Sequence, residues 1–143
     1  FEIVTYLKKI YDKKFVLIGE DWRKYSIDSL KSNYDTKKNK KIYKGNICLD
    51  TGSIEGSSSL YSRANQIIES GGLIVQSYAF DASEHWKDLK QDLLFKNFDE
   101  LRNIIDKLIN NLELSNILLD KISKHFKYSS ISMEKTLNRY FSK

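Results

Sequence analysis

The order of apolar and polar positions predicts alternating helices and strands in the first half of the chain. Apolar residues recur at helical spacing in Glu2–Tyr11, which predicts an amphipathic helix. The run KFVLIGE (14–20) is almost continuously apolar and is closed by a glycine, as expected for a short strand buried on both faces. GNICLD (45–50) has the same character and predicts a second strand.

A helix and two further strands are predicted next. In GSSSLYSRANQIIESGG (56–72) the serines offer an N-cap and the two glycines a stop, while the apolar residues fall at helical spacing: Leu60, Ala64, Ile67 and Ile68. LIVQSY (73–78) predicts a third strand, and DLLF (92–95) a short fourth one.

The last third of the chain is predicted to be helical. Asn97 and Glu100 have capping-box spacing, and the helix they begin carries one apolar stripe of Phe98, Leu101, Ile104, Ile105, Leu108 and Ile109. Two more helices are expected, near 112–126 and 130–141. Apolar strands alternating with helices predict an α/β fold, a Rossmann-like parallel sheet flanked by helices with a helical C-terminal annex.

Composition narrows the class of protein. The 143 residues, 41% apolar and 30% charged, fit a single domain, 1–143, and no apolar run approaches the roughly 20 residues of a membrane helix.

Because Phe1 is not an initiator methionine and no leader precedes it, we expect a fragment of a longer chain. The one cysteine, Cys48, excludes an intrachain disulfide and is expected to be a small buried residue, which fits a reducing, cytoplasmic compartment.

The positive charge is concentrated in the first third of the chain. Up to residue 44 there are 12 Lys/Arg against 6 Asp/Glu, and from residue 45 onward 12 against 13. The densest part, KKNKKIYK (37–44), is either a solvated lysine-rich loop or a contact for phosphate groups, a membrane surface or nucleic acid. No aromatic ladder or zinc-ligand spacing supports a nucleic-acid module, so we expect no nucleic-acid partner.

The tetrad Asp50-Thr51-Gly52-Ser53 has the letters of an aspartic-protease active site. That chemistry requires two carboxylates that share a proton, in an all-β fold. Here no second tetrad exists, and a helix is predicted a few residues later. We therefore interpret the tetrad as a strand end and a turn, in which Asp50 shapes the turn or reaches a hydroxyl.

The predicted junction between strand and helix is a candidate phosphate site. In open α/β sheets, ligands bind beyond the carboxyl ends of the strands, near helix N-termini. The loop offers small residues whose backbone N–H groups could approach a phosphate: Gly52, Ser53, Ser57, Ser58 and Ser59. Ser59, Arg63 and Gln66 form a polar edge beside the apolar stripe of the helix. This edge is either an ordinary boundary row or a set of ligand contacts, with Arg63 suited to a diphosphate and Gln66 to sugar hydroxyls.

Residues 40–140 resemble the C-terminal, donor-binding half of GT-B glycosyltransferases, in particular the group related to the CgeB spore-maturation proteins. The resemblance lies in KIYKGNICLD, SRANQIIESGGLIV, DLLFKNFDELRNIIDKLINN and the closing helices. Arg63 matches the arginine of the family pattern, Gly71 its glycine and LIV its strand. Upstream, FVLIGEDW is similar to an earlier strand that ends in a glycine, an acidic residue and a tryptophan, here Gly19, Glu20 and Trp22.

The resemblance also has departures. The family glutamate that contacts the nucleotide ribose is replaced by Gln66, which can still form a hydrogen bond but without charge assistance. A second glutamate, which faces the donor sugar in retaining relatives, is replaced by Ser58. The N-terminal acceptor domain of the family is missing, so the resemblance implies one half of a GT-B fold that is inactive by itself.

As a function, the resemblance implies binding of a nucleotide-sugar donor for sugar transfer to a glycan, lipid or protein acceptor, in bacterial surface-polysaccharide assembly or protein glycosylation. No cofactor or metal is expected beyond the nucleotide-diphosphate sugar. The substrate-binding residues would lie in the loop and helix named above, with Gly19 and Trp22 as further contacts. The location would be the cytoplasm or the inner face of the membrane. The alternative is a non-catalytic interaction domain that uses residues 37–44 to contact a membrane surface or a partner.

Two histidines and two tryptophans are further candidates for chemistry. His85 and His125 lack a Cys, His or carboxylate at metal-ligand spacing, which predicts surface or boundary positions and no metal site. Trp86 is expected at the rim of the core. Trp22 either stacks near a bound base or attaches its loop to the core.

Overall fold

The computed structural model describes residues 1–19, 21–31, 36–52 and 62–141. The chain divides into two compact units, Phe1–Asn39 and Lys40–Lys143. The larger unit contains a three-stranded parallel sheet. Each unit is described by itself.

The smaller unit begins with helix α1 (Glu2–Tyr11), as the sequence predicts, and α1 buries Val4 and Leu7. Two short 3-10 helices follow, η1 (Asp12–Lys14) and η2 (Trp22–Tyr25). Helix α2 (Thr36–Tyr43) follows, and the boundary between the two units lies within its sequence.

The predicted strand at 14–20 is wrong. The segment forms only an isolated parallel bridge between Ile18 and Leu30, in which the Leu30 N–H donates to Leu17 O (2.9 Å) and the Gly19 N–H donates to Leu30 O (2.9 Å). Val16 is 57% exposed, so the run is not buried on both faces. An apolar run indicates a preference for burial but does not specify a pairing partner, and this segment pairs locally across η2.

The sheet consists of β1 (Ile47–Asp50), β2 (Leu73–Ser77) and β3 (Leu94–Phe95), in the order β1-β2-β3 and parallel throughout. The register places Asp50 beside Gln76, and Ser77 beside Phe95. The central strand supplies the middle of the core, with Leu73, Ile74 and Val75 at most 2% exposed. The predicted class, a Rossmann-like parallel sheet flanked by helices, is confirmed, although β3 is shorter than 92–95.

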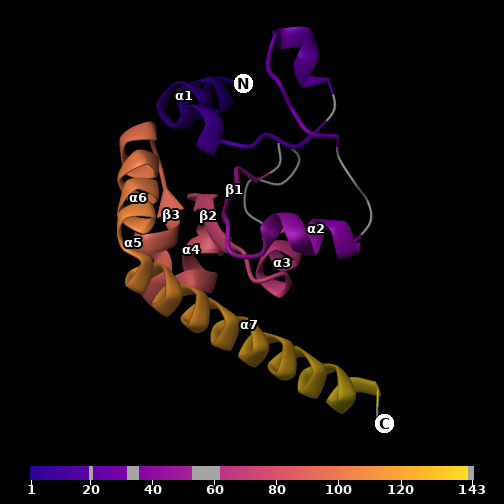
Figure 1. The fold of residues 1–143 in the computed structure, drawn as a ribbon. Coiled ribbons are helices and arrows are strands. Elements are labelled where there is room, and N and C mark those ends of the chain that lie inside the picture. Colours follow the sequence, from indigo (N-terminus) through magenta and orange to yellow (C-terminus); the bar gives the residue numbers. More distant parts are fainter. Residues whose placement is uncertain (20, 32–35, 53–61, 142–143) are drawn as a thin grey trace. The chain divides into compact units, whose positions relative to one another are not determined.

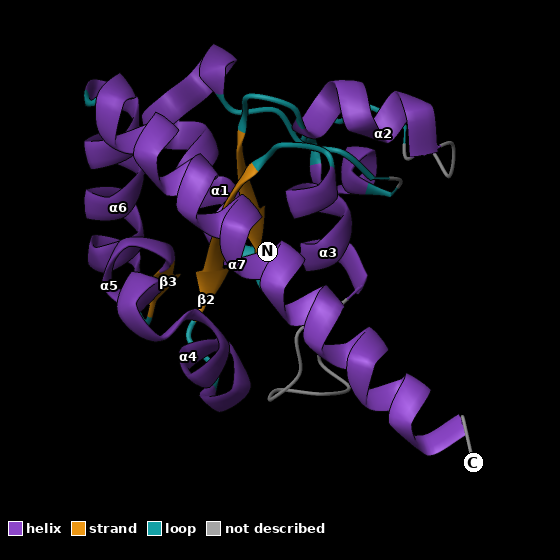
Figure 2. Ribbon diagram, turned by 90° about the horizontal axis from the view of Figure 1, so that it is seen from below, coloured by secondary structure: helices purple, strands orange, loops and turns teal. Residues whose placement is uncertain are grey.

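Helices connect and cover these strands. Helix α3 (Ser62–Glu69) follows β1 and contacts β1 and β2, and helix α6 (Phe98–Asn110) follows β3 and contacts it (Figure 1, Figure 2). Between β2 and β3 the chain forms α4 (Phe80–Trp86), η3 (Lys87–Leu89) and α5 (Lys90–Leu93). Helix α7 (Leu112–Phe141) packs on α3, α6 and β2.

The capping box of α6 is confirmed. The Glu100 N–H donates to Asn97 Oδ1 (2.9 Å), and Glu100 Oε2 accepts from the Lys96 N–H (2.8 Å). Four positions of the predicted stripe are buried: Leu101, Ile104, Ile105 and Leu108. Phe98 and Ile109, at its margins, are 37% and 43% exposed.

The predicted break between the last two helices is wrong, because α7 is continuous for 30 residues. The linking stretch KYSS (127–130) contains neither glycine nor proline, so nothing in it interrupts the helical hydrogen bonds. The C-terminal half of α7 extends away from the sheet (Figure 1, Figure 2).

The stop of α3 is a Schellman motif, as the two glycines predict. The Gly72 N–H donates to Ile67 O (2.9 Å) and the Gly71 N–H to Ile68 O (3.0 Å), while Gly71 adopts the left-handed φ of +76°. A Cβ on Gly72 would lie 2.9 Å from Ile67 Cγ2, 3.0 Å from Tyr43 O and 3.1 Å from Cys48 Sγ. Gly72 therefore allows α3, β1 and the end of α2 to approach one another closely.

We expect Gly72→Ala to lower the free energy of unfolding by about 1–3 kcal/mol, because the added methyl group meets backbone as well as side chains. Urea denaturation measures the change. Asn65→Ala, a change at an exposed position of α3, is the control, and its free energy of unfolding should stay within about 0.5 kcal/mol of the wild-type value. If Gly72→Ala were as stable as the wild type, this would contradict the close approach of α3, β1 and the end of α2.

Candidate functional site

The three parallel strands end at one edge of the sheet, called here the carboxyl edge. Its described residues are the last residues of the strands and those that follow them: Asp50, Thr51 and Gly52 at the end of β1, Ser77 and Tyr78 at the end of β2, and Lys96 after β3. The Tyr78 N–H donates to Phe95 O (2.7 Å), which continues the pairing of β2 with β3 beyond the last strand residue. This edge is where parallel α/β folds place their ligands.

A chain of buried polar side chains lies behind the edge. Asp50 Oδ2 accepts from Gln76 Nε2 (3.0 Å), and Gln76 Oε1 accepts from Trp86 Nε1 (2.6 Å). The three side chains are only 2%, 5% and 1% exposed, respectively. The indole N–H can only donate, so it fixes the amide of Gln76 with its oxygen toward Trp86 and its NH2 toward the carboxylate.

This chain corrects the expectation for Trp86, which is fully buried in the core and not at its rim. The sequence places Trp86 in a polar stretch, DASEHWKD, and no local pattern shows that α4 turns it toward β2. The expected turn-shaping role of Asp50 is confirmed, since Asp50 Oδ1 accepts from the Gly52 N–H (3.3 Å). No pattern in the sequence identified Gln76 as the partner of Asp50, because this contact depends on the register of β1 and β2.

Of the predicted loop residues, Gly52 is described, and Ser53, Ser57, Ser58 and Ser59 lie outside the described residues. Gly52 is exposed, with a left-handed φ of +73° that favours glycine. A Cβ at Gly52 would lie 3.8 Å from Ser77 Oγ, so the turn after β1 lies beside the end of β2.

Arg63 and Gln66 are both exposed on α3, while Ala64, Ile67 and Ile68 are buried. The predicted polar edge of this helix is confirmed for these two residues. Arg63 is the second residue of α3 and forms no ion pair with a described carboxylate. Its guanidinium has its hydrogen-bonding donors available for an anion.

Lys96 and Tyr78 are site residues that the sequence did not reveal. Lys96 Nζ lies 4.6 Å from the centroid of the Tyr78 ring, and Tyr78 is 46% exposed. No described carboxylate pairs with the Lys96 ammonium group. The nearby Glu100 caps α6 with its carboxylate. Two cations, Arg63 and Lys96, are therefore available on the segments that follow β1 and β3.

Gly19 and Trp22 belong to the smaller unit and lie against each other there. A Cβ on Gly19 would be 3.1 Å from Trp22 Nε1, and the φ of Gly19 is +146°. Trp22 is half-buried and meets Gly19 within its own loop, so this contact does not show the expected attachment of that loop to the core. The Trp22 and Tyr25 rings are 6.4 Å apart in the same unit.

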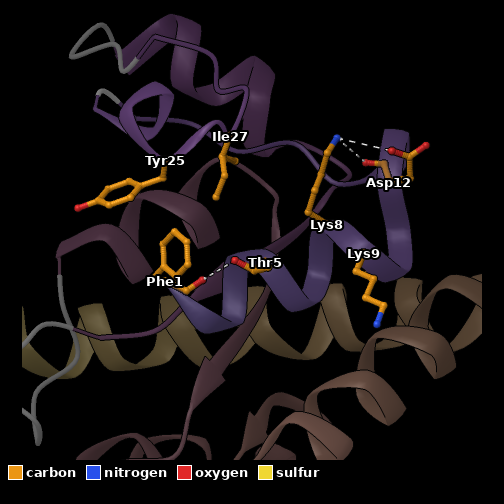
Figure 3. A pocket seen from close by; sticks show the side chains of 7 residues that line it. All are labelled: Phe1, Thr5, Lys8, Lys9, Asp12, Tyr25 and Ile27. Atoms are coloured by element: carbon orange, nitrogen blue, oxygen red, sulfur yellow. Dashed lines mark hydrogen bonds and ion pairs between the residues drawn. The ribbon is translucent and has the colours of Figure 1, made fainter.

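The smaller unit also has an open hollow of about 330 Å³ (Figure 3), lined by Phe1, Thr5, Lys8, Lys9, Asp12, Tyr25 and Ile27. The rings of Phe1 and Tyr25 are 5.2 Å apart, and Lys8 reaches Asp12 (3.7 Å). The ammonium group of Lys8 is thus partly neutralised.

Cys48 is half-buried and not fully buried as expected. Burial raises the pKa of its thiol to about 12, so the group is protonated at neutral pH and is a poor nucleophile. Within the described parts of the chain, no three His, Cys, Asp or Glu side chains gather as a metal site. The two histidines, which the sequence treats separately, lie together with ring centroids 4.7 Å apart.

No described helix has both the length and the apolar character required to cross a membrane. Comparisons with protein-family models, with curated proteins and with solved structures found no match. The fold and the site define a parallel α/β protein with a polar, cation-bearing carboxyl edge.

We expect Gln76→Glu to destabilise the protein at pH 7 by at least about 2 kcal/mol, because it places a second buried carboxylate beside Asp50. The pKa of the introduced carboxyl should rise in the folded state, so the loss relative to wild type should shrink as the pH falls toward 5. Urea denaturation at several pH values measures this dependence. Gln91→Glu, the same change at an exposed position, is the control. Equal effects of the two substitutions would contradict the buried hydrogen bond.

Proposed function

We propose that the unit Lys40–Lys143 is the donor-binding half of a GT-B-type glycosyltransferase, and that it binds a nucleotide-diphosphate sugar at its carboxyl edge. The observation that carries the proposal is the charge distribution there. Arg63 and Lys96 have no described carboxylate partner, whereas Asp50 and Glu100 are engaged in hydrogen bonds with protein donors. A diphosphate would supply the missing negative charge.

Each contact follows from the chemistry of a side chain. Arg63, at the start of α3, would bind the diphosphate through its planar set of donors, and the helix N-terminus adds partial positive charge. Gln66, one turn later on the same exposed row, would bond a ribose hydroxyl. Gly52 would let the backbone approach the phosphates. The resemblance of residues 40–140 to the donor-binding halves of GT-B enzymes supports the same assignment.

Sugar transfer would need a second domain. In GT-B enzymes the acceptor lies across a cleft from the donor, and catalysis depends on orientation and on stabilisation of the leaving diphosphate. We propose that this unit supplies the donor and the charge stabilisation, and that an N-terminal domain supplies the glycan, lipid or protein acceptor. The unit alone is then expected to bind a donor without turning it over.

A second candidate function is binding to an anionic membrane surface or partner through residues 37–44. The observation that favours it is that most of this segment is helical. Helix α2 presents Lys37, Lys38, Lys40 and Lys41, all exposed. A row of exposed lysines on one helix concentrates positive charge as an extended loop would not.

Calorimetric titration with UDP, GDP, CDP, their sugars and inorganic diphosphate tests the donor site. We expect one nucleotide series to bind, and Arg63→Ala to weaken binding roughly tenfold to a hundredfold, the value of one or two charge-assisted hydrogen bonds. Arg102→Ala is the matched control, since Arg102 is an exposed arginine on α6 that pairs with Asp106 (3.4 Å).

Absence of nucleotide binding, or binding that is indifferent to Arg63→Ala, would overturn the donor-site proposal. Liposome sedimentation with the four α2 lysines changed to glutamine separates the second candidate. If that variant loses vesicle binding while nucleotides do not bind wild type, the interaction function is the correct one.

A further inference from the structure

Three aromatic rings join α4 to α7. His85 and Trp86 are neighbours on α4, and His125 comes from α7. The His85 and His125 rings meet edge to face with centroids 4.7 Å apart, and the Trp86 ring is 4.6 Å from His85 and 5.8 Å from His125. Trp86 is fully buried, while both imidazoles are half-buried and within reach of protons from solvent.

The two imidazoles cannot both carry a proton at this separation without repulsion. The pKa of His85 lies below its usual value, first because burial disfavours the charged ring and second because a charge on His125 opposes it. His85 forms no ion pair with a described carboxylate. At neutral pH the contact is therefore made by a neutral His85.

The charged side chains nearest in sequence are Asp81, Glu84, Lys87 and Asp88 beside His85, and Lys121 and Lys124 beside His125. All six are exposed, so water screens their effect on the rings. Lys124 is also paired with Asp120 (2.6 Å).

The ring cluster is also connected to the carboxyl edge. Trp86 donates to Gln76, and Gln76 donates to Asp50, which in turn holds the turn at Gly52. A movement of Trp86 that follows a change at the histidines would therefore reach the end of β1 through two hydrogen bonds.

We propose that the His85–Trp86–His125 contact is an acid-sensitive latch that holds α7 on α4 and, through Trp86, keeps the Gln76–Asp50 pair in place. His85 accepts a proton more readily when the contact is open, because its pKa is lowered in the closed contact. Stability of the contact is thus fully present above about pH 6.5, the ordinary pKa of histidine, and is lost as the pH falls through the lowered pKa of His85. As long as opening takes up one proton, each unit by which the pH falls lowers the equilibrium constant for the closed contact about tenfold.

Hydrogen exchange of the whole chain between pH 7.5 and 5 tests the latch. After correction for the intrinsic pH dependence, amides of α7 up to residue 127 should exchange faster at pH 5.5 than at pH 7, by at most about tenfold per pH unit, and α6 amides should change much less. In His85→Phe, which keeps a ring but removes the group whose pKa is lowered, the acceleration should disappear. In His125→Phe, which removes only the neighbouring charge and leaves His85 buried, the acceleration should become smaller.

Trp86 fluorescence supplies the second readout. In the Trp22→Phe variant Trp86 is the single remaining tryptophan, and its emission should change below pH 6.5 in that background but not when His85→Phe is added. If His85→Phe fails to fold, His85→Gln serves the same comparison. No pH-dependent exchange in α7, or a transition that survives removal of His85, would overturn the proposal. Donor binding is not part of either readout, so the latch and the proposed function can fail separately.

Discussion

The hydrogen-bonded chain from Asp50 through Gln76 to Trp86 is the interaction on which the functional edge depends. A carboxylate that is 2% exposed is costly unless N–H donors satisfy it, and here the donors come from the neighbouring strand and from the turn that follows Asp50. The oxygen of the same Gln76 amide accepts a hydrogen bond from the indole N–H of Trp86. One side chain thus satisfies two buried partners and connects β1, β2 and α4.

The candidate site is built on that chain. Because Asp50 holds the Gly52 N–H, the chain leaves β1 in a fixed direction beside Ser77. Gln76 and Asp50 are buried and hydrogen-bonded to each other, whereas the described groups exposed near this edge include the cations Arg63 and Lys96 and the ring of Tyr78. A buried carboxylate beside exposed cations is the basis on which we propose an anionic ligand, such as a diphosphate, for this edge.

Local patterns in the sequence predicted the elements whose cause is local. The helix at Glu2–Tyr11, the glycine stop of α3 and the cap at Asn97 were all correct, since each depends on residues a few positions apart. The strand at 14–20 was wrong because an apolar run does not specify a pairing partner, and the break in α7 was wrong because the stretch 127–130 contains neither glycine nor proline. The sequence missed Gln76, Lys96 and the meeting of His85 with His125 because these contacts join residues that are distant in the sequence. The polar row of Arg63 and Gln66 was visible because helical periodicity alone exposes it.

A double-mutant cycle between Gln76 and Trp86 tests the central claim most directly, with Gln76→Met, Trp86→Phe and the double variant compared by urea denaturation. If one amide satisfies both the indole and the carboxylate, each single substitution leaves a buried group without its partner, and the two effects are not additive. We predict a coupling of at least about 1 kcal/mol. Effects that add to within about 0.3 kcal/mol would contradict the account, because Gln76 and Trp86 would then act independently.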